Sequence, residues 1–312
     1  MRIGTSAMID VLKNNMAVPS NRLGDLYSQL SSGKKLQEPS DDPLAAARVV
    51  SGQAALNELT ARKFVLQQGT EFVGATDTAL GQISQSLSQI QDVALQANEP
   101  ELTDDQRSAL ADQVRETSSA LVTAGNSEVQ GQYIFAGSQT GTTPFVAASG
   151  QNLPVMYDGN NQQLSYMITS SEQAPVGFTG AQVFNFPDAQ GNRPLSGVTM
   201  DTFSLLNNLA NSIESGDTAQ TTSLTDQLNQ TYSYVVGLRG ENGIVAQRYQ
   251  SASTVADDTG VQVQTMLSSD QDVDYASAMT DLSQEETAYQ AALSVTSKLL
   301  QTPNLFETSW QA

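Results

Sequence analysis

Apolar residues recur every seven positions between Pro43 and Asn98, and this pattern organises the rest of the chain. Such a repeat is typical of a long helix that packs on other helices along its whole length. One row consists of Leu59, Leu66, Val73, Leu80, Leu87 and Ala94. A second row contains Ala55, Gly69, Ile83, Ile90 and Ala97, with Arg62 and Thr76 as polar interruptions. Asp42 can cap this helix, Pro43 suits its first position, and Pro100 stops it. At about 1.5 Å per residue, the helix would be roughly 80 Å long.

Helical spacing continues on both sides of this stretch. A helix over about residues 6–32 carries an apolar row made of Ile9, Leu12, Met16, Leu23, Leu26 and Leu30. Gly33 ends this helix, and Pro19 should kink or split it. Thr103 and Gln106 have the spacing of a capping box, which predicts a helix to about Val129. The short link after Asn98 favours an antiparallel hairpin of the two helices.

The carboxyl-terminal third predicts helices again. A short helix from about Asp201 ends at Gly216, and Asp217 with Gln220 can cap the next one. That helix has a seam from Leu224 to Ala252, although glycines 237, 240 and 243 weaken its middle. The last helix carries the row Met279, Leu282, Tyr289, Leu293 and Leu300 and ends at Pro303. We therefore expect the two ends of the chain to pair.

The pattern changes from helical to alternating between residues 131 and 200. Tyr133–Phe135 is a candidate strand, residues 155–157 and 164–168 read as a hairpin through Asp158-Gly159, and residues 176–186 suggest further strands. The predicted fold is mainly α, with long antiparallel coiled-coil-like helices from both chain ends and a small β-rich domain inserted in the middle. The expected domains are terminal axial helices 1–40 and 270–312, a helical rod 41–130 and 201–269, and a β-rich insert 131–200.

The composition excludes several classes of function. The chain of 312 residues has no cysteine and no histidine, which removes thiol chemistry, disulfides, most zinc sites and the commonest acid/base residue. A net charge of −19 argues against nucleic acid. The first 20 residues lack the apolar core of a secretory signal, and no apolar run is long enough to insert into a membrane.

Acidic residues provide the remaining candidates for chemistry. Asp270, Asp272, Asp274 and Asp281 have the spacing of a calcium loop, but Tyr275 stands where that loop needs glycine, so an acidic linker or helix start is the better interpretation. The carboxylate pairs are Asp41/Asp42, Asp104/Asp105 and Glu285/Glu286. Caps, helix dipoles and a solvated helix face account for these pairs. We therefore predict no catalytic residue, no cofactor and no metal, and a protein that is not an enzyme.

Several local strings resemble the flagellin superfamily. They are the 30–47 string LSSGKKLQEPSDDPLAAA, the 131–137 string GQYIFAG with TPF at 143–145, and DVDYA at 272–276 with QAAL at 290–293. The Ser40–Pro43 and Gly131–Gly137 strings are closer to the hook–filament junction proteins of the superfamily than to flagellin itself. The resemblance covers about residues 1–146 and 220–312.

The resemblance implies a structural part of the bacterial flagellum, exported unfolded through the type III channel without a cleaved signal. Its terminal segments would be disordered in the monomer and fold into axial helices on assembly. The two terminal apolar rows, in residues 6–32 and 279–300, would be its assembly surfaces. Expected partners are further copies in a ring, the neighbouring hook-associated protein, flagellin, and an export chaperone at the carboxyl-terminal segment. The alternatives are flagellin itself, a secreted coiled-coil effector or translocator, and an enzyme with a site in residues 131–200.

Overall fold

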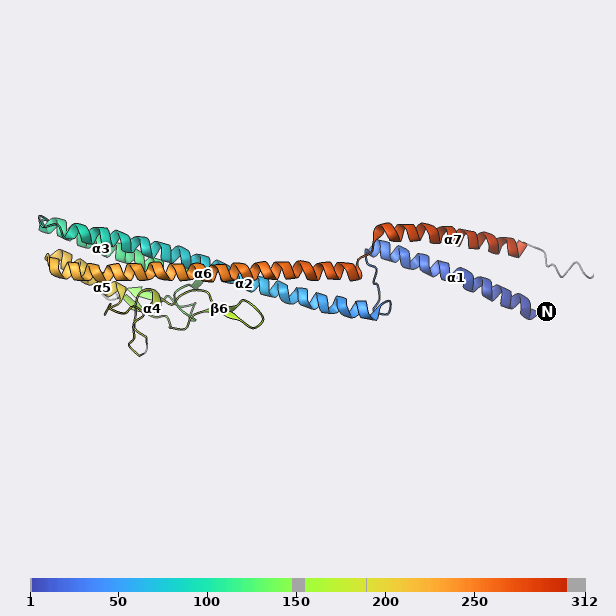
Figure 1. The fold of residues 1–312 in the computed structure, drawn as a ribbon, viewed down its shortest axis with the longest axis horizontal. Coiled ribbons are helices and arrows are strands. Elements are labelled where there is room, and N and C mark those ends of the chain that lie inside the picture. The colour runs from blue at the N-terminus through green and yellow to red at the C-terminus, as the bar shows by residue number, and fades with distance from the viewer. Residues whose placement is uncertain (1, 148–154, 189, 302–312) are drawn as a thin grey trace, which may run out of the picture. The chain divides into compact units, whose positions relative to one another are not determined.

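The computed structural model describes residues 2–147, 155–188 and 190–301 (Figure 1). The helices are α1 (Arg2–Ser32), α2 (Pro43–Ala97), α3 (Asp104–Gly125), α4 (Gly180–Val183), α5 (Thr202–Ser215), α6 (Thr218–Gln271) and α7 (Tyr275–Gln301). The strands are β1 (Glu128–Val129), β2 (Gln132–Tyr133), β3 (Phe145–Ala147), β4 (Val155–Tyr157), β5 (Ser165–Met167) and β6 (Gln173–Pro175). This order confirms a mainly helical fold with a small β-rich part in the middle of the chain.

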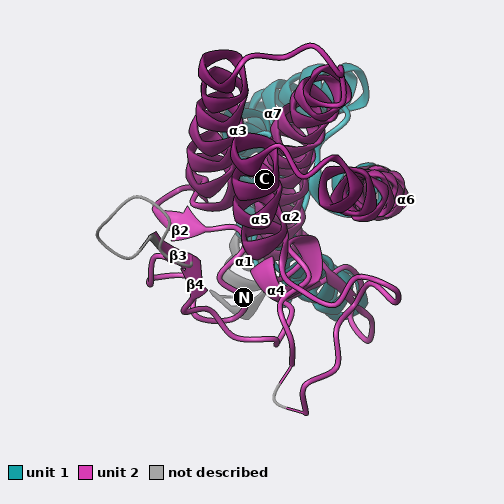
Figure 2. Cartoon of the chain, turned by 90° about the vertical axis from the view of Figure 1, so that its left-hand side faces the viewer, with its two compact units in different colours: residues 1–58, 259–312 teal, residues 59–258 magenta. Residues whose placement is uncertain are grey.

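The chain forms two compact units, coloured separately in Figure 2. Unit 1 consists of residues 1–58 and 259–312, and unit 2 of residues 59–258. Unit 1 is thus built from both ends of the chain. Unit 2 holds α3, α5, the strands and most of α2 and α6.

Side-chain caps fix the helix starts where the sequence predicts them. The carboxylate of Asp42 accepts hydrogen bonds from the amides of Leu44 (3.0 Å) and Ala45 (2.9 Å), which begins α2. Thr103 opens α3 with a complete capping box. Asp217 accepts from the amide of Gln220 at 2.9 Å and opens α6. These bonds satisfy amides that lack a partner in the first turn of a helix.

Two helices run further than their local sequence suggests. α1 continues through Pro19, so the predicted split of this helix is not observed. Proline removes only one amide donor, and the helical turns on both sides of it persist. α6 continues through its glycines and past Ala252 to Gln271. Packing of its apolar face outweighs the weak helix propensity of glycine, which amounts to about 1 kcal/mol per residue.

The core of unit 2 lies along the seam between α2 and α6. From Leu59 onward, the apolar positions of the α2 repeat are almost completely buried there. Tyr249 of α6 is fully buried, and its hydroxyl donates a hydrogen bond of 2.8 Å to the carbonyl of Ala174, next to Gly69 of α2. Asn242 of α6 donates to the carbonyl of Val73 at 3.0 Å. The side chains of α2 and α6 therefore interlock at a defined register, and one of these contacts also holds β6.

Strand pairing in the β-rich part differs from the predicted hairpin. β4 pairs antiparallel with β3 and β5 with β6, so β4 and β5 are not partners in a hairpin and that prediction is wrong. The cross-strand pair of Phe145 and Tyr157 explains the choice, because its rings lie 5.3 Å apart inside an aromatic cluster with Phe184 and Phe203. The Tyr157 hydroxyl donates a hydrogen bond of 2.9 Å to the carbonyl of Asn160. This bond holds the residues after β4 in a conformation other than the tight turn of the predicted hairpin.

The predicted strands in residues 176–186 are also wrong. This stretch contains the short helix α4, which Thr179 and Gln182 open with a capping box. The predicted strand at Tyr133 ends with that residue, and the Ile134 and Phe135 side chains that follow are buried in the core. These apolar side chains are buried in the core rather than placed in a strand pair.

Candidate assembly surfaces

The two ends of the chain pair within unit 1, as the sequence predicts. α1 and α7 lie side by side and run in opposite directions (Figure 1). The Tyr27 hydroxyl donates a hydrogen bond of 2.6 Å to the carboxylate of Glu286. At the base of the pair, the amide of Lys35 donates to the carbonyl of Gln271 (2.7 Å), and the amide of Val273 donates to the carbonyl of Gly33 (3.0 Å). The two linkers are thereby joined where α1 ends and α7 begins.

The predicted terminal rows are only partly covered by this pairing. Met16, Leu23, Leu26, Leu30 and Tyr289 are half-buried, and Leu282 is buried. Met279 is 57% exposed and Leu293 is 40% exposed. The side chains of Ile9, Leu12 and Leu300, as well as Pro303, lie outside the described part of the chain. Unit 1 therefore presents apolar side chains to solvent along the helices that the sequence singled out, and their role in assembly stays a prediction.

The aspartates with calcium-like spacing have structural partners in unit 1. Arg48 holds Asp270 with two hydrogen bonds of 2.8 Å, which raises the pKa of Arg48 and lowers the pKa of Asp270. Asp274 accepts from the amide of Ala276 at 3.0 Å at the start of α7, and Asp272 accepts from the Ser268 hydroxyl at 2.6 Å. Across the described residues, no cluster of carboxylates has the arrangement of a metal site. Their contacts match the interpretation as an acidic linker and helix start.

The acidic residues Asp104 and Glu214 of unit 2 likewise hold structure together. Asp104 pairs with Arg107 at 2.5 Å in the first turn of α3. Arg115 joins α3 to α5 through Glu214 at 2.5 Å, and this contact raises the pKa of Arg115.

None of the described helices carries an apolar stretch sufficient to cross a membrane.

Comparison with protein families places both ends of the chain. The family model described as the bacterial flagellin N-terminal helical region matches residues 3–140, and the bacterial flagellin C-terminal helical region matches residues 225–306. The chain belongs to the flagellin superfamily. The N-terminal flagellin region contains nearly all of α1 together with α2 and α3, and the C-terminal region contains most of α6 and all of α7. The unmatched residues 141–224 contain most of the β-rich part.

Within the flagellin superfamily, the relatives point to the hook-associated proteins. The flagellar hook-associated protein 3 of Salmonella typhimurium is 27% identical over 308 residues, which cover 94% of this chain and 95% of the relative. Among solved structures, Xanthomonas campestris FlgL has a TM-score of 0.60 at 16% identity, covering 70% of this chain and 99% of that one. The flagellar junction protein FlgL of Legionella pneumophila has a TM-score of 0.57 at 16% identity, covering 72% of this chain and all of that one. The structures support the shared fold, and the sequence match supports the predicted branch of the superfamily.

Sequence reasoning missed the side-chain contacts that hold this flagellin-like architecture in register. The bond between Tyr27 and Glu286 joins residues 259 positions apart. The Tyr249 ring packs in the space left by the missing side chain of Gly69, and the sequence did not predict that these two residues are partners. The available signal was a glycine in a heptad row of α2, because a missing side chain there allows close approach of a large partner.

Proposed function

We propose that this protein is a structural subunit of the bacterial flagellum that joins the hook side to the flagellin filament. The observation that carries this proposal is the match over 94% of the chain to a flagellar hook-associated protein 3. The structure supports it through the paired terminal helices and their exposed apolar side chains. The proposed work of the protein is packing, and ion pairs such as those of Arg48 with Asp270 and Arg115 with Glu214 support it by holding helices together.

The proposed partners are other components of the flagellum. The protein would associate with further copies in a ring, with the neighbouring hook-associated protein on one side and with flagellin on the other. An export chaperone would bind the carboxyl-terminal segment before secretion, and the assembled protein would lie outside the cell at the junction. The surfaces proposed for assembly are the rows Ile9, Leu12, Met16, Leu23, Leu26, Leu30, Met279, Leu282, Tyr289, Leu293 and Leu300.

Addition of the purified protein to hook ends that lack it tests the adapter function. Flagellin should then polymerise from those ends, and the protein alone should not form long filaments. Long filaments of the protein alone would identify it as a filament subunit instead. Failure of flagellin to grow after the protein has bound to the hooks would refute the adapter function.

Exposed members of the α7 row allow a sharper test of the surface. The double variant Met279→Ser and Leu293→Ser removes two apolar side chains that remain partly exposed beside α1, so the circular dichroism of the isolated protein should change little. Binding to hook ends should fall, because the buried apolar area of the assembled state is lost. Gln284→Ser with Gln290→Ser, also at exposed positions of α7, is the matched control and should bind as the parent protein does.

A further inference from the structure

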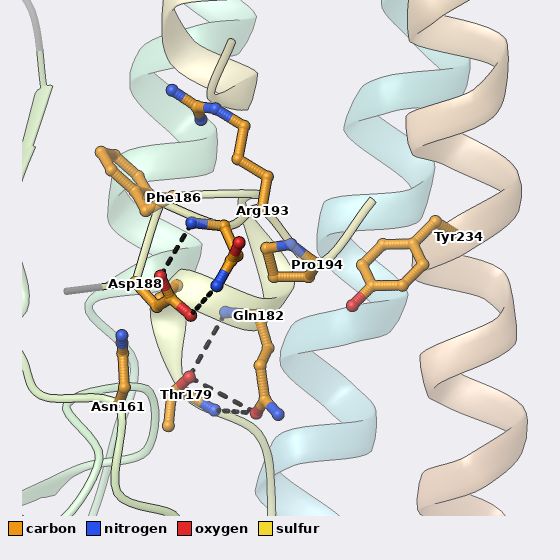
Figure 3. A pocket seen from close by; sticks show the side chains of 10 residues that line it. Asn161, Thr179, Gln182, Phe186, Asp188, Arg193, Pro194 and Tyr234 are labelled. Carbon is orange, nitrogen blue, oxygen red and sulfur yellow. Dashed lines mark hydrogen bonds between the residues drawn. The ribbon is translucent and has the colours of Figure 1, made fainter. Parts of the chain in front are cut away.

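A cavity of about 320 Å³ lies in unit 2 between α6 and the segment that contains α4 (Figure 3). Its walls include Asn161, Gln182, Phe186, Asp188, Pro194 and Tyr234. A volume of roughly 300 Å³ is the lower end of the range for small-molecule pockets in proteins. Most such pockets are predominantly apolar, whereas the surface of this one is about half polar and half apolar. Such a lining favours a ligand that carries both hydroxyl groups and a C–H face.

Asp188 provides a fixed acceptor in this cavity. Its carboxylate accepts hydrogen bonds from the amides of Gln190 (2.9 Å) and Asn192 (2.8 Å) and from the side-chain amide of Asn192 (3.1 Å). These bonds lower the pKa of Asp188, led by the one from the Asn192 amide. The carboxylate is therefore ionised and oriented before any ligand arrives.

Other polar groups of the cavity have hydrogen-bonding capacity that the protein does not use. Gln182 accepts from the amide of Thr179 at 3.0 Å and from the side chain of Gln163 at 3.1 Å, which leaves its own amide hydrogens without an acceptor in the described structure. The Tyr234 hydroxyl and the Asn161 side-chain amide make no hydrogen bond to another described residue. Figure 3 shows the Tyr234 hydroxyl directed from α6 toward the α4 segment.

One carboxylate and one guanidinium belong to the residues that line the cavity, those of Asp188 and Arg193. Arg193 donates to the carbonyl of Asn185 at 2.6 Å, and its guanidinium points away from Asp188 (Figure 3). A ligand that bonds to the Asp188 carboxylate meets its negative charge, which would repel a second carboxylate. The Phe186 ring and Pro194 supply apolar surface of the kind that packs on the C–H face of a ring.

We propose that this cavity is a binding site for a neutral saccharide ring. Sugar hydroxyls can donate to the Asp188 carboxylate and accept from the amide of Gln182 and the hydroxyl of Tyr234. Weak binding is expected, because the cavity is small and open. This inference rests on the cavity itself and does not depend on the proposed role in the flagellum.

Ligand-observed nuclear magnetic resonance on the full chain tests the proposal, with glucose, galactose and N-acetylglucosamine as probes. At least one of these sugars should bind, and glucuronate should bind more weakly than glucose. Tyr234→Phe removes only the unused hydroxyl and should weaken binding about three- to tenfold, the effect of one neutral hydrogen bond. Tyr232→Phe, at another half-buried tyrosine of α6 that does not line the cavity, should leave binding unchanged.

Asn161→Ala, at an exposed position, repeats the test without altering α6 and should also weaken binding. Absence of binding by all three sugars overturns the proposal. Tighter binding of glucuronate than of glucose overturns the assigned ligand class. If Tyr234→Phe and Tyr232→Phe weaken or preserve sugar binding to the same extent, the sugar binds elsewhere on the protein and the assigned site is wrong.

Discussion

Gly69 is the position in α2 where one added carbon has the largest predicted effect on stability. A Cβ atom built there would lie 2.7 Å from Cδ1 of Tyr249, 3.0 Å from its Cζ and closer still to Cε1. The ring cannot easily move, because Tyr249 is fully buried and its hydroxyl is bonded to the Ala174 carbonyl at 2.8 Å. Gly69→Ala therefore forces α2 and α6 apart or breaks the bond to β6.

The magnitude follows from two opposing effects. Overpacking a well-filled core costs about 1–3 kcal/mol, and the rigid ring places this site at the upper end. Alanine regains about 1 kcal/mol over glycine in helix propensity. The net loss is about 2 kcal/mol, and with a urea slope of about 2–3 kcal/mol per molar the unfolding midpoint should fall by roughly 0.7–1 M.

Urea denaturation followed by circular dichroism measures this change, with Gly74→Ala as the control. Gly74 lies on the same helix with no atom within 4 Å of its added Cβ, so alanine there should stabilise the protein by about 1 kcal/mol. In a Tyr249→Ala background the clash is gone, and Gly69→Ala should become stabilising as well. A Gly69→Ala midpoint that rises as much as the Gly74→Ala midpoint would refute the interlocking of α2 and α6.

Three further changes have defined outcomes. Asn242→Leu removes the bond to the Val73 carbonyl, but it also removes a buried side-chain oxygen that has no partner in the described structure, and leucine suits the seam. The urea midpoint should therefore rise by the equivalent of about 1 kcal/mol, and a fall in the midpoint would show that the bond to Val73 outweighs these gains. Asn126→Ala should destabilise unit 2 by about 2 kcal/mol, because the Asn126 side chain exchanges hydrogen bonds of 2.8 and 2.9 Å with the backbone of Phe145 in β3. Thermal unfolding measures this loss, and an unchanged unfolding temperature would contradict the prediction. Burial raises the pKa of Tyr157 and of Tyr249 to about 12. The contribution of both tyrosines to stability should be complete below about pH 10 and decline toward pH 12, because the unfolded chain loses the hydroxyl protons at lower pH than the folded protein. Ultraviolet titration should show both tyrosines ionising near pH 12, and Tyr249→Phe should remove one of these two ionisations.

Short-range signals were sufficient for the helical framework. The start of α2 depends on Asp42 and Pro43, and the start of α3 depends on the pair Thr103 and Gln106, all within one turn of the helix they open. The seven-residue repeat also predicted which face of α2 is buried, since seven residues make about two helical turns and therefore return to the same face. The flagellin-like strings lie in the same regions and led to the family that the comparisons identify.

The candidate cavity and the strand pairs were beyond the reach of the sequence. Tyr234 is one of nine tyrosines, and no local pattern relates it to Asp188 or Gln182. The hairpin prediction joined β4 to β5 because they are neighbours in the chain and a glycine lies between them. The aromatic cluster around Phe145 decided otherwise, since a buried ring contact outweighs a turn preference.

By itself, the sequence determined where α2, α3 and α6 begin, which face of α2 is buried and that both chain ends carry apolar rows, because these features depend on residues a few positions apart. The tertiary structure alone decided that α1 continues through Pro19, that Tyr27 meets Glu286, and that Tyr249 fits over Gly69. Each of these depends on a partner far away in the chain or on packing that outweighs local propensity. Local rules can neither name such a partner nor weigh its contribution.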